Sequence, residues 1–162
     1  MADRESPEFL ESFSALSRSL RGVAAQAYAA LEVGSTQAKF LRHIGLGGRL
    51  SQADLARATA TDPTLAGRAL ETLIERGWVR RKRSQADRRQ YVLELSASGQ
   101  RVRARVEAER ARIAARIMAA LDDRDRADFE RIAAKLHAAF EPAASAGAPR
   151  VARAVAARRA RP

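Results

Sequence analysis

SQADLARATATDPTLAGRALETLIERGWVRRKRSQADRRQYVLEL, residues 51–95, is the stretch that decides the predicted fold. It predicts two short helices joined by a tight turn and followed by a basic hairpin. Ser51 and Asp54 have the spacing of a capping box, in which a hydroxyl and a carboxylate satisfy free N–H groups at a helix start. Asp62 and Pro63 predict the start of the second helix, because aspartate caps well and proline at the first helical position loses no hydrogen bond.

The second helix is expected to run from Pro63 to about Arg76. Apolar residues at helical spacing predict a buried face made of Ala66, Ala69, Leu70 and Leu73. Gly77 is the expected C-terminal cap, since glycine enters the left-handed region without a steric penalty. The opposite face consists of Thr64, Leu65, Gly67, Arg68 and Thr72. Small residues with one guanidinium suit the major groove of DNA, and ordinary protein surface is the competing interpretation.

A basic hairpin is predicted after this helix, with strands at 78–83 and 90–95 and a polar loop at 84–89. From Arg76 to Arg89 the chain carries seven cationic residues and a single acid, Asp87. A hairpin in solvent does not need this imbalance. A hairpin that lies along phosphates gains from it, because each neutralised phosphate releases counterions. The hairpin therefore indicates nucleic acid as a partner.

Four segments continue this pattern in a fixed order and spacing. They are Leu50-Ser51-Gln52 with Leu55-Ala56, Asp62-Pro63-Thr64 with Arg68, Leu73-x-x-x-Gly77-Trp78-Val79-x-Arg81, and Asp87-Arg88-Arg89 followed by Leu95-Ser96-x-x-Gly99. Together they make residues 51–99 resemble the winged helix–turn–helix of the MarR family of bacterial transcription regulators. The chain departs from the family's pattern at Leu65 and Gly67, where many members carry small hydroxyl residues.

The resemblance implies a homodimeric, ligand-responsive repressor that binds a pseudo-palindromic double-stranded DNA operator in a sequence-specific way. The recognition helix then reads the major groove, and Arg88 or Arg89 of the wing enters the adjacent minor groove. Other residues mainly hold the phosphate backbone, among them Ser51, Gln52, Thr61 and Arg81. The complete set of expected DNA-binding residues is Ser51, Gln52, Thr61, Pro63, Thr64, Leu65, Gly67, Arg68, Thr72, Arg81, Arg83, Arg88 and Arg89.

The resemblance also implies a switch, because many members bind small phenolic or other aromatic anions between the dimer helices and the reading head. Tyr28, Phe40 and His43 are the candidate lining residues in this chain, with ordinary core or surface positions as the competing interpretation. The chain has no cysteine, which excludes a peroxide-sensing version.

The expected fold class is mainly α with a small β wing (α+β), a winged helix–turn–helix flanked by N- and C-terminal dimerisation helices. Residues 1–33 and 97–141 are assigned to dimerisation, 34–96 to DNA binding and 142–162 to a disordered basic tail. The first helix is expected at Pro7–Val33, with a monomeric bundle as the alternative to pairing. Its heptad-like apolar seam is Phe9, Phe13, Leu16, Leu20, Val23 and Ala27.

Three further helices and one short strand complete this prediction. One helix is expected to be capped by Ser35 or Thr36 and to end at Gly45, Gly47 and Gly48, and a candidate strand at Arg49-Leu50 lies beside the hairpin. A second helix is expected from about Ala97 to Leu121. A third is expected to be capped by Asp123 or Asp125 and to end near Phe140.

Length and charge limit the class of protein further. The 162 residues suit about one domain, and a net charge of +11 argues for a polyanionic partner. No run of about 18 apolar residues occurs. The N-terminus, MADRESPEFLES, is too acidic and polar for a signal peptide. A cytoplasmic protein without a membrane partner is therefore expected.

Catalysis needs a converging set of groups, and none is recognisable here. The only histidines, His43 and His137, are far apart in the sequence, and no phosphate loop, nucleophile elbow or zinc motif occurs. The chain is expected to be no enzyme and to use neither metal nor cofactor. Two alternatives stay open: a sequence-neutral architectural protein that coats nucleic acid, and a helical protein–protein adaptor with an incidental basic face.

Overall fold

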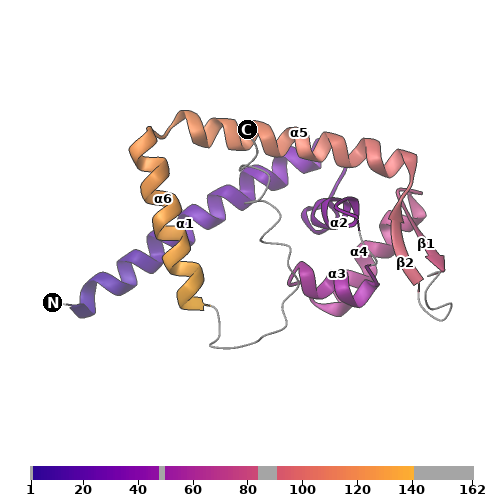
Figure 1. Ribbon diagram of the computed structural model, residues 1–162, viewed down its shortest axis with the longest axis horizontal. Coiled ribbons are helices and arrows are strands. Elements are labelled where there is room, and N and C mark those ends of the chain that lie inside the picture. The colour runs from indigo at the N-terminus through magenta and orange to yellow at the C-terminus, as the bar shows by residue number, and fades with distance from the viewer. Residues whose placement is uncertain (1, 48–49, 84–90, 141–162) are drawn as a thin grey trace, which may run out of the picture. The chain divides into compact units, whose positions relative to one another are not determined.

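The computed structural model describes residues 2–47, 50–83 and 91–140, with the backbone alone for residues 2–6. Helices dominate these residues, and a two-stranded antiparallel sheet lies between the fourth and fifth helices (Figure 1). The elements are α1 (Ala2–Ala29), α2 (Ser35–Gly45), α3 (Gln52–Ala58), α4 (Pro63–Glu75), β1 (Val79–Arg83), β2 (Tyr91–Leu95), α5 (Ala97–Ala119) and α6 (Asp123–Phe140). The predicted mainly α fold with a small β wing is confirmed.

The described chain divides into two compact units after Ile117, near the end of α5. The first unit contains the helix–turn–helix and the hairpin, and the second contains α6. No helix among the described residues is both long enough and apolar enough to cross a membrane.

Both ends of α4 form as the sequence predicts. The Asp62 carboxylate accepts hydrogen bonds from the backbone N–H groups of Thr64 and Leu65, at 2.9 and 3.0 Å. At the other end Gly77 has a φ of +66°, and the Trp78 N–H donates to the Leu73 carbonyl at 2.9 Å. This reversal is a Schellman motif, which stops the helix and turns the chain into β1.

The predicted capping box of α3 is also present. The Ser51 hydroxyl accepts from the Asp54 N–H at 3.2 Å, and the Asp54 carboxylate accepts from the Ser51 N–H at 3.1 Å. The Thr59 hydroxyl closes the far end by donating to the Leu55 carbonyl at 2.8 Å. These local bonds fix both ends of the short α3.

A buried core holds these elements together. It includes the predicted inner face of α4, Ala66, Ala69, Leu70 and Leu73. Val106 brings α5 into the same core, and Tyr28 and Val33 bring in the end of α1 and the turn after it. The largest fully buried side chains are Phe40, Leu41, Leu55, Leu70, Leu73, Val79 and Val106. Because the inner face of α4 is fixed in this way, its other face must point to solvent.

The hairpin pairs β1 with β2 in antiparallel register, from Val79 opposite Leu95 to Arg83 opposite Tyr91. Val79 and Leu93 are buried and anchor the hairpin to the core. The Leu50 carbonyl accepts from the Leu93 N–H at 3.0 Å, yet Leu50 itself is no strand. Of the expected strand at Arg49-Leu50, only Leu50 belongs to the described residues. It contacts the hairpin through this hydrogen bond and does not form a strand.

The bounds of α1 differ from the prediction. The helix begins at Ala2 and contains Pro7, which loses only one hydrogen bond near the helix start. It ends at Ala29 instead of Val33, because the chain turns there through Glu32, whose φ is 56°. This turn directs Val33 into the core, where it is 2% exposed.

Two predicted caps are displaced by one residue or more. Gly34, and neither Ser35 nor Thr36, caps α2, and its N–H donates to the Gln37 side chain at 3.0 Å. For α6 the cap is Asp122, whose carboxylate accepts from the Asp125 N–H at 2.8 Å while Asp125 accepts in return at 3.1 Å. In both cases the residue three positions after the cap decides which candidate is used.

Candidate nucleic-acid interface

The outer face of α4 contains the five residues that the sequence assigns to the major groove. Thr64, Leu65 and Arg68 are exposed, while Gly67 and Thr72 are half-buried. Leu65 is 50% exposed, although the inner face of the same helix is packed in the core. The structure therefore brings the predicted reading residues together on one surface.

The strand β1 adds a row of cations beside this surface. Arg80, Arg81, Lys82 and Arg83 are all exposed. The Glu94 carboxylate lies 3.4 Å from Arg80 and 3.3 Å from Lys82, so the positive charge on their side of the strand is partly neutralised. Arg83 stacks over the Tyr91 ring at 5.6 Å. Arg88 and Arg89, the predicted minor-groove residues, lie outside the described residues.

Arg81 connects the wing to both helices of the helix–turn–helix. Its Nη2 donates to the Glu71 carboxylate at 2.7 Å and to the Gln52 side-chain oxygen at 3.4 Å. Glu71 has no signal in the sequence, because a lone acid on an exposed helix face gains a role only when the fold places it opposite an arginine.

The expected backbone-holding residues near α3 have internal partners. The hydroxyl of Ser51 is used by the capping box, and the Thr61 hydroxyl lies 2.8 Å from that of Thr59. Hydrogen bonds from the side chain and backbone of Ser51 lower the pKa of the Asp54 carboxyl, and Arg57 adds a smaller effect. Pro63 is exposed at the start of α4.

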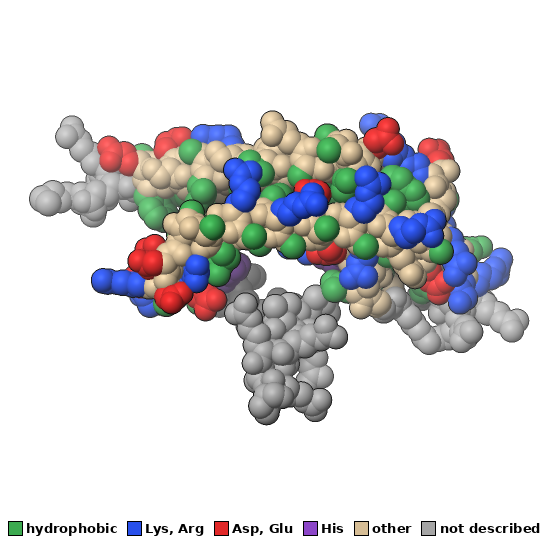
Figure 2. Space-filling model, turned by 90° about the horizontal axis from the view of Figure 1, so that it is seen from above, with side chains coloured by type: hydrophobic (Ala, Val, Ile, Leu, Met, Phe, Trp, Pro, Cys, Tyr) green, Lys and Arg blue, Asp and Glu red, His purple; other side chains and the backbone are tan. Residues whose placement is uncertain are grey.

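Cationic charge is not confined to the wing. Figure 2 shows Lys and Arg side chains spaced along the surface of α5. The exposed arginines on this helix include Arg101, Arg105, Arg112 and Arg116. Net charge alone therefore does not locate the interface, and the juxtaposition of α4 with β1 is the more specific feature.

Residues 31–90, which include the whole helix–turn–helix and β1, match the sequence profile of the MarR family. They form a MarR-family domain. The resemblance found in the sequence is thereby confirmed. No curated protein sequence matches the chain.

Solved structures of MarR-family proteins resemble the chain well beyond this domain. A MarR transcriptional regulator from Methanosarcina mazei is 25% identical, with a TM-score of 0.67 over 83% of this chain and 95% of that one. The Mycobacterium tuberculosis MarR family protein Rv2887, solved with p-aminosalicylic acid, is 26% identical, with a TM-score of 0.64 over 78% and 96%. A MarR mutant from E. coli, solved with operator DNA, is 17% identical and shares the fold, with a TM-score of 0.70 over 82% and 95%.

The three candidate effector residues occupy different environments in the MarR-family domain and the end of α1. Phe40 is fully buried and Tyr28 is 7% exposed, and both belong to the core cluster. His43 is half-buried, and its Nδ1 lies 3.0 Å from the Lys39 carbonyl of the same helix. Two of the three therefore have a structural role in the packed core.

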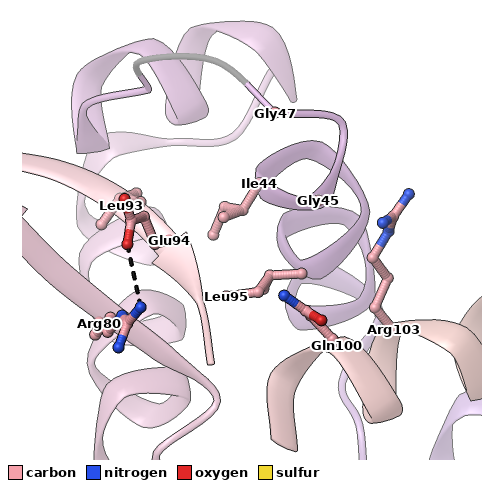
Figure 3. Close-up of a pocket in the computed structure, with 9 residues that line it drawn as sticks. All are labelled: Ile44, Gly45, Gly47, Arg80, Leu93, Glu94, Leu95, Gln100 and Arg103. Carbon is pink, nitrogen blue, oxygen red and sulfur yellow. Dashed lines mark hydrogen bonds and ion pairs between the residues drawn. The ribbon is translucent and has the colours of Figure 1, made fainter. Parts of the chain in front are cut away.

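A hollow of about 480 Å³ lies between the end of α2, the hairpin and the start of α5, and Tyr28, Phe40 and His43 are not among its lining residues. Figure 3 shows Ile44 and Leu95 between the helix and the strand, and Arg103 beside Gly45. A Cβ on Gly45 would lie 2.3 Å from the Arg103 Cδ, so glycine makes room for this side chain. The lining residues are Ile44, Gly45, Gly47, Arg80, Leu93, Glu94, Leu95, Gln100 and Arg103.

The described part of the MarR-family domain and its flanking helices holds no group of three or more His, Cys, Asp or Glu side chains that could bind a metal ion.

Proposed function

We propose that the chain is a sequence-specific transcription regulator that binds double-stranded DNA in the cytoplasm. The observation that carries this proposal is the exposed outer face of α4 beside the cationic strand β1, within a MarR-family domain. The operator complex of the structurally similar E. coli MarR mutant supports the same function. We call the outer face of α4, with Thr64, Leu65, Gly67, Arg68 and Thr72, the reading face. A protein that coats DNA without sequence preference would not need such a surface.

Two side chains of the reading face have clear partners among base edges. Arg68 is exposed and can donate two hydrogen bonds to guanine, and Leu65 suits the methyl group of thymine. The wing residues Arg88 and Arg89 extend the contact into the minor groove. Replacing both with alanine is expected to weaken operator binding and to lower its dependence on salt, as the loss of phosphate-facing cations requires.

The decisive experiment is selection of bound sequences from random duplexes, followed by footprinting with competitor DNA present. A regulator protects a short dyad site, whereas an architectural protein protects no defined site. Arg68→Ala is expected to relax selection at one position and to cost about 1–3 kcal/mol of binding free energy. The matched control is Arg105→Ala on α5, which removes the same charge away from the reading face and leaves the selected sequence unchanged.

We further propose that the regulator is a homodimer. Apolar side chains on α1 are 45–64% exposed in the single chain, and a patch of this kind on a soluble protein normally marks an interface. The patch consists of Phe9, Leu10, Phe13, Leu16 and Leu20. Sedimentation tests the dimer: Phe13→Asp is expected to dissociate it, and Leu46→Asp, which changes an exposed leucine at the end of α2, is the control.

We also propose that the regulator responds to small aromatic acids and that it represses transcription when no such ligand is bound. It is supported by the p-aminosalicylic acid complex of Rv2887. Such a ligand releases DNA only if it binds more tightly to the conformation that does not fit the operator. Titration of the protein–operator complex with p-aminosalicylic acid tests this, and benzoic acid, which lacks its hydroxyl and amino groups, tests how specific the response is.

A further inference from the structure

Three elements of the helix–turn–helix and wing meet at the guanidinium of Arg81. Its Nη2 lies 2.7 Å from a Glu71 carboxylate oxygen on α4 and 3.4 Å from the Gln52 side-chain oxygen on α3. The side chain of Arg81 is 40% exposed and that of Glu71 is 53% exposed, so the pair lies at the protein surface. Arg81 is thus bound to two protein acceptors.

The same contact determines where the Gln52 amide points. Glu71 and Gly67 lie one helical turn apart on α4, on the side that faces β1. The Gln52 Nε2 lies 3.5 Å from the position that a Cβ on Gly67 would occupy. Because the Gln52 oxygen accepts from Arg81, its NH₂ group is the end that lies over Gly67, at the edge of the reading face.

Charge makes Arg81 a poor phosphate ligand in this arrangement. Its guanidinium is paired with Glu71, and the Glu71 carboxylate would repel a phosphate that approached the same guanidinium. The Gln52 NH₂ group has no such obstacle, since it is neutral, exposed and a hydrogen-bond donor.

We propose that Arg81 is a positioning residue, which joins the wing to α4 through Glu71 and orients Gln52, and that the Gln52 NH₂ group contacts a base edge beside Gly67. This inference rests on the proposed function of the chain as a DNA-binding regulator. It assigns different roles to two residues that the sequence places together as holders of the DNA backbone.

A double-mutant cycle separates the two roles of Arg81. Arg81→Gln and Glu71→Gln are each expected to weaken operator binding by about two- to fivefold, which is the range for exposed ion pairs, and the double variant by no more than either one. The salt dependence of binding should stay that of the wild type for Arg81→Gln. The inference is overturned if Arg81→Gln lowers the salt slope by about one, or if Glu71→Gln tightens binding, because both results identify Arg81 as a phosphate ligand.

Arg80→Gln is the matched control, since it removes a neighbouring arginine of β1 that pairs with Glu94 within the hairpin. It is expected to leave the coupling between positions 71 and 81 intact. If the two positions are coupled no more strongly than positions 71 and 80, the positioning role is wrong.

The role of Gln52 is tested by sequence selection. Gln52→Ala is expected to relax the preference at one base position by about tenfold, within the range for lost base-edge contacts. At position 67, alanine should preserve this preference because its Cβ meets Nε2 at an ordinary contact distance, whereas leucine should abolish it by displacing the amide. An unchanged selected sequence in Gln52→Ala overturns the reading role.

Hydrogen exchange in the protein without DNA distinguishes failure of this inference from failure of the proposed function. Glu71→Gln should speed exchange of the β1 amides if the pair fixes the wing, whatever the protein binds. Faster exchange together with a wild-type protein that binds no duplex refutes the proposed function and with it the Gln52 contact. Unchanged exchange in a protein that does bind an operator refutes only the positioning role.

Discussion

The reading head and the helical arms differ in how much of their apolar surface is buried. The head, which consists of α2, α3, α4 and the hairpin, encloses its own large side chains, and Phe40 is fully buried there. The arms, α1 and α6, expose theirs: Phe13 on α1 is 48% exposed and Phe129 on α6 is 62% exposed. The head therefore buries its large apolar side chains within one chain, whereas the arms leave theirs available for contact with another surface.

Core deletion should give the largest difference between these regions. Phe40→Ala is expected to cost about 3–5 kcal/mol of unfolding free energy at every protein concentration, because it leaves a cavity in the head. Phe13→Ala is expected to have an effect that depends on protein concentration, because the proposed dimer buries this exposed side chain between chains. Denaturant unfolding over a hundredfold range of concentration measures both. A concentration-independent loss for Phe13→Ala would contradict the comparison.

Two glycines offer the next largest contrast. A Cβ on Gly99 would lie 1.9 Å from the Trp78 carbonyl oxygen, so Gly99→Ala must move the start of α5 away from the hairpin. A loss of about 1–3 kcal/mol is expected from this overpacking. Gly22 in α1 has open space around its Cβ position, and Gly22→Ala should stabilise the helix by about 0.5–1 kcal/mol. Thermal unfolding measures both variants, and the midpoint temperature is expected to fall for Gly99→Ala and to rise for Gly22→Ala.

Helix caps provide a smaller and more local test. Asp62→Ala removes the acceptor for two N–H groups at the start of α4 and should cost about 1 kcal/mol. Asp122→Ala removes the corresponding cap of α6. Only the first variant should also weaken operator binding, because only α4 carries the reading face. Operator affinity is measured by fluorescence anisotropy. Equal weakening by both variants would show that α6 also affects DNA binding and does not act through dimerisation alone.

The smallest expected effect concerns pH. Hydrogen bonds from Ser51 lower the pKa of Asp54 in the folded protein below its value in the unfolded chain. The carboxylate therefore stabilises the head above the ordinary aspartate range, and this contribution disappears as the pH falls through the folded-state pKa. Asp54→Asn should be less stable than the wild type at neutral pH, and the difference should shrink in acid. If the stability difference between Asp54→Asn and the wild type grew in acid, the pKa of Asp54 could not be lowered by folding.

The sequence predicted most of the head because its signals are local. Asp62, Pro63 and Gly77 lie at the ends of α4, and each acts through hydrogen bonds or backbone angles within a few residues. The caps of α2 and α6 were predicted less well, because several adjacent polar residues compete and small differences in reciprocal hydrogen bonding select Gly34 and Asp122. The left-handed turn at Glu32 gave no signal, since glutamate rarely adopts a positive φ.

By itself, the sequence determined where the recognition helix begins and ends, which of its faces is buried and how basic the neighbouring strand is. These properties depend on spacing and residue type within about one or two helical turns. Only the tertiary structure decided that Glu71 pairs with Arg81, that Gln52 lies over Gly67 and that Phe40 belongs to the core. Such contacts join residues on different secondary-structure elements, and they exist only after burial of the common core has brought α3, α4 and the hairpin together.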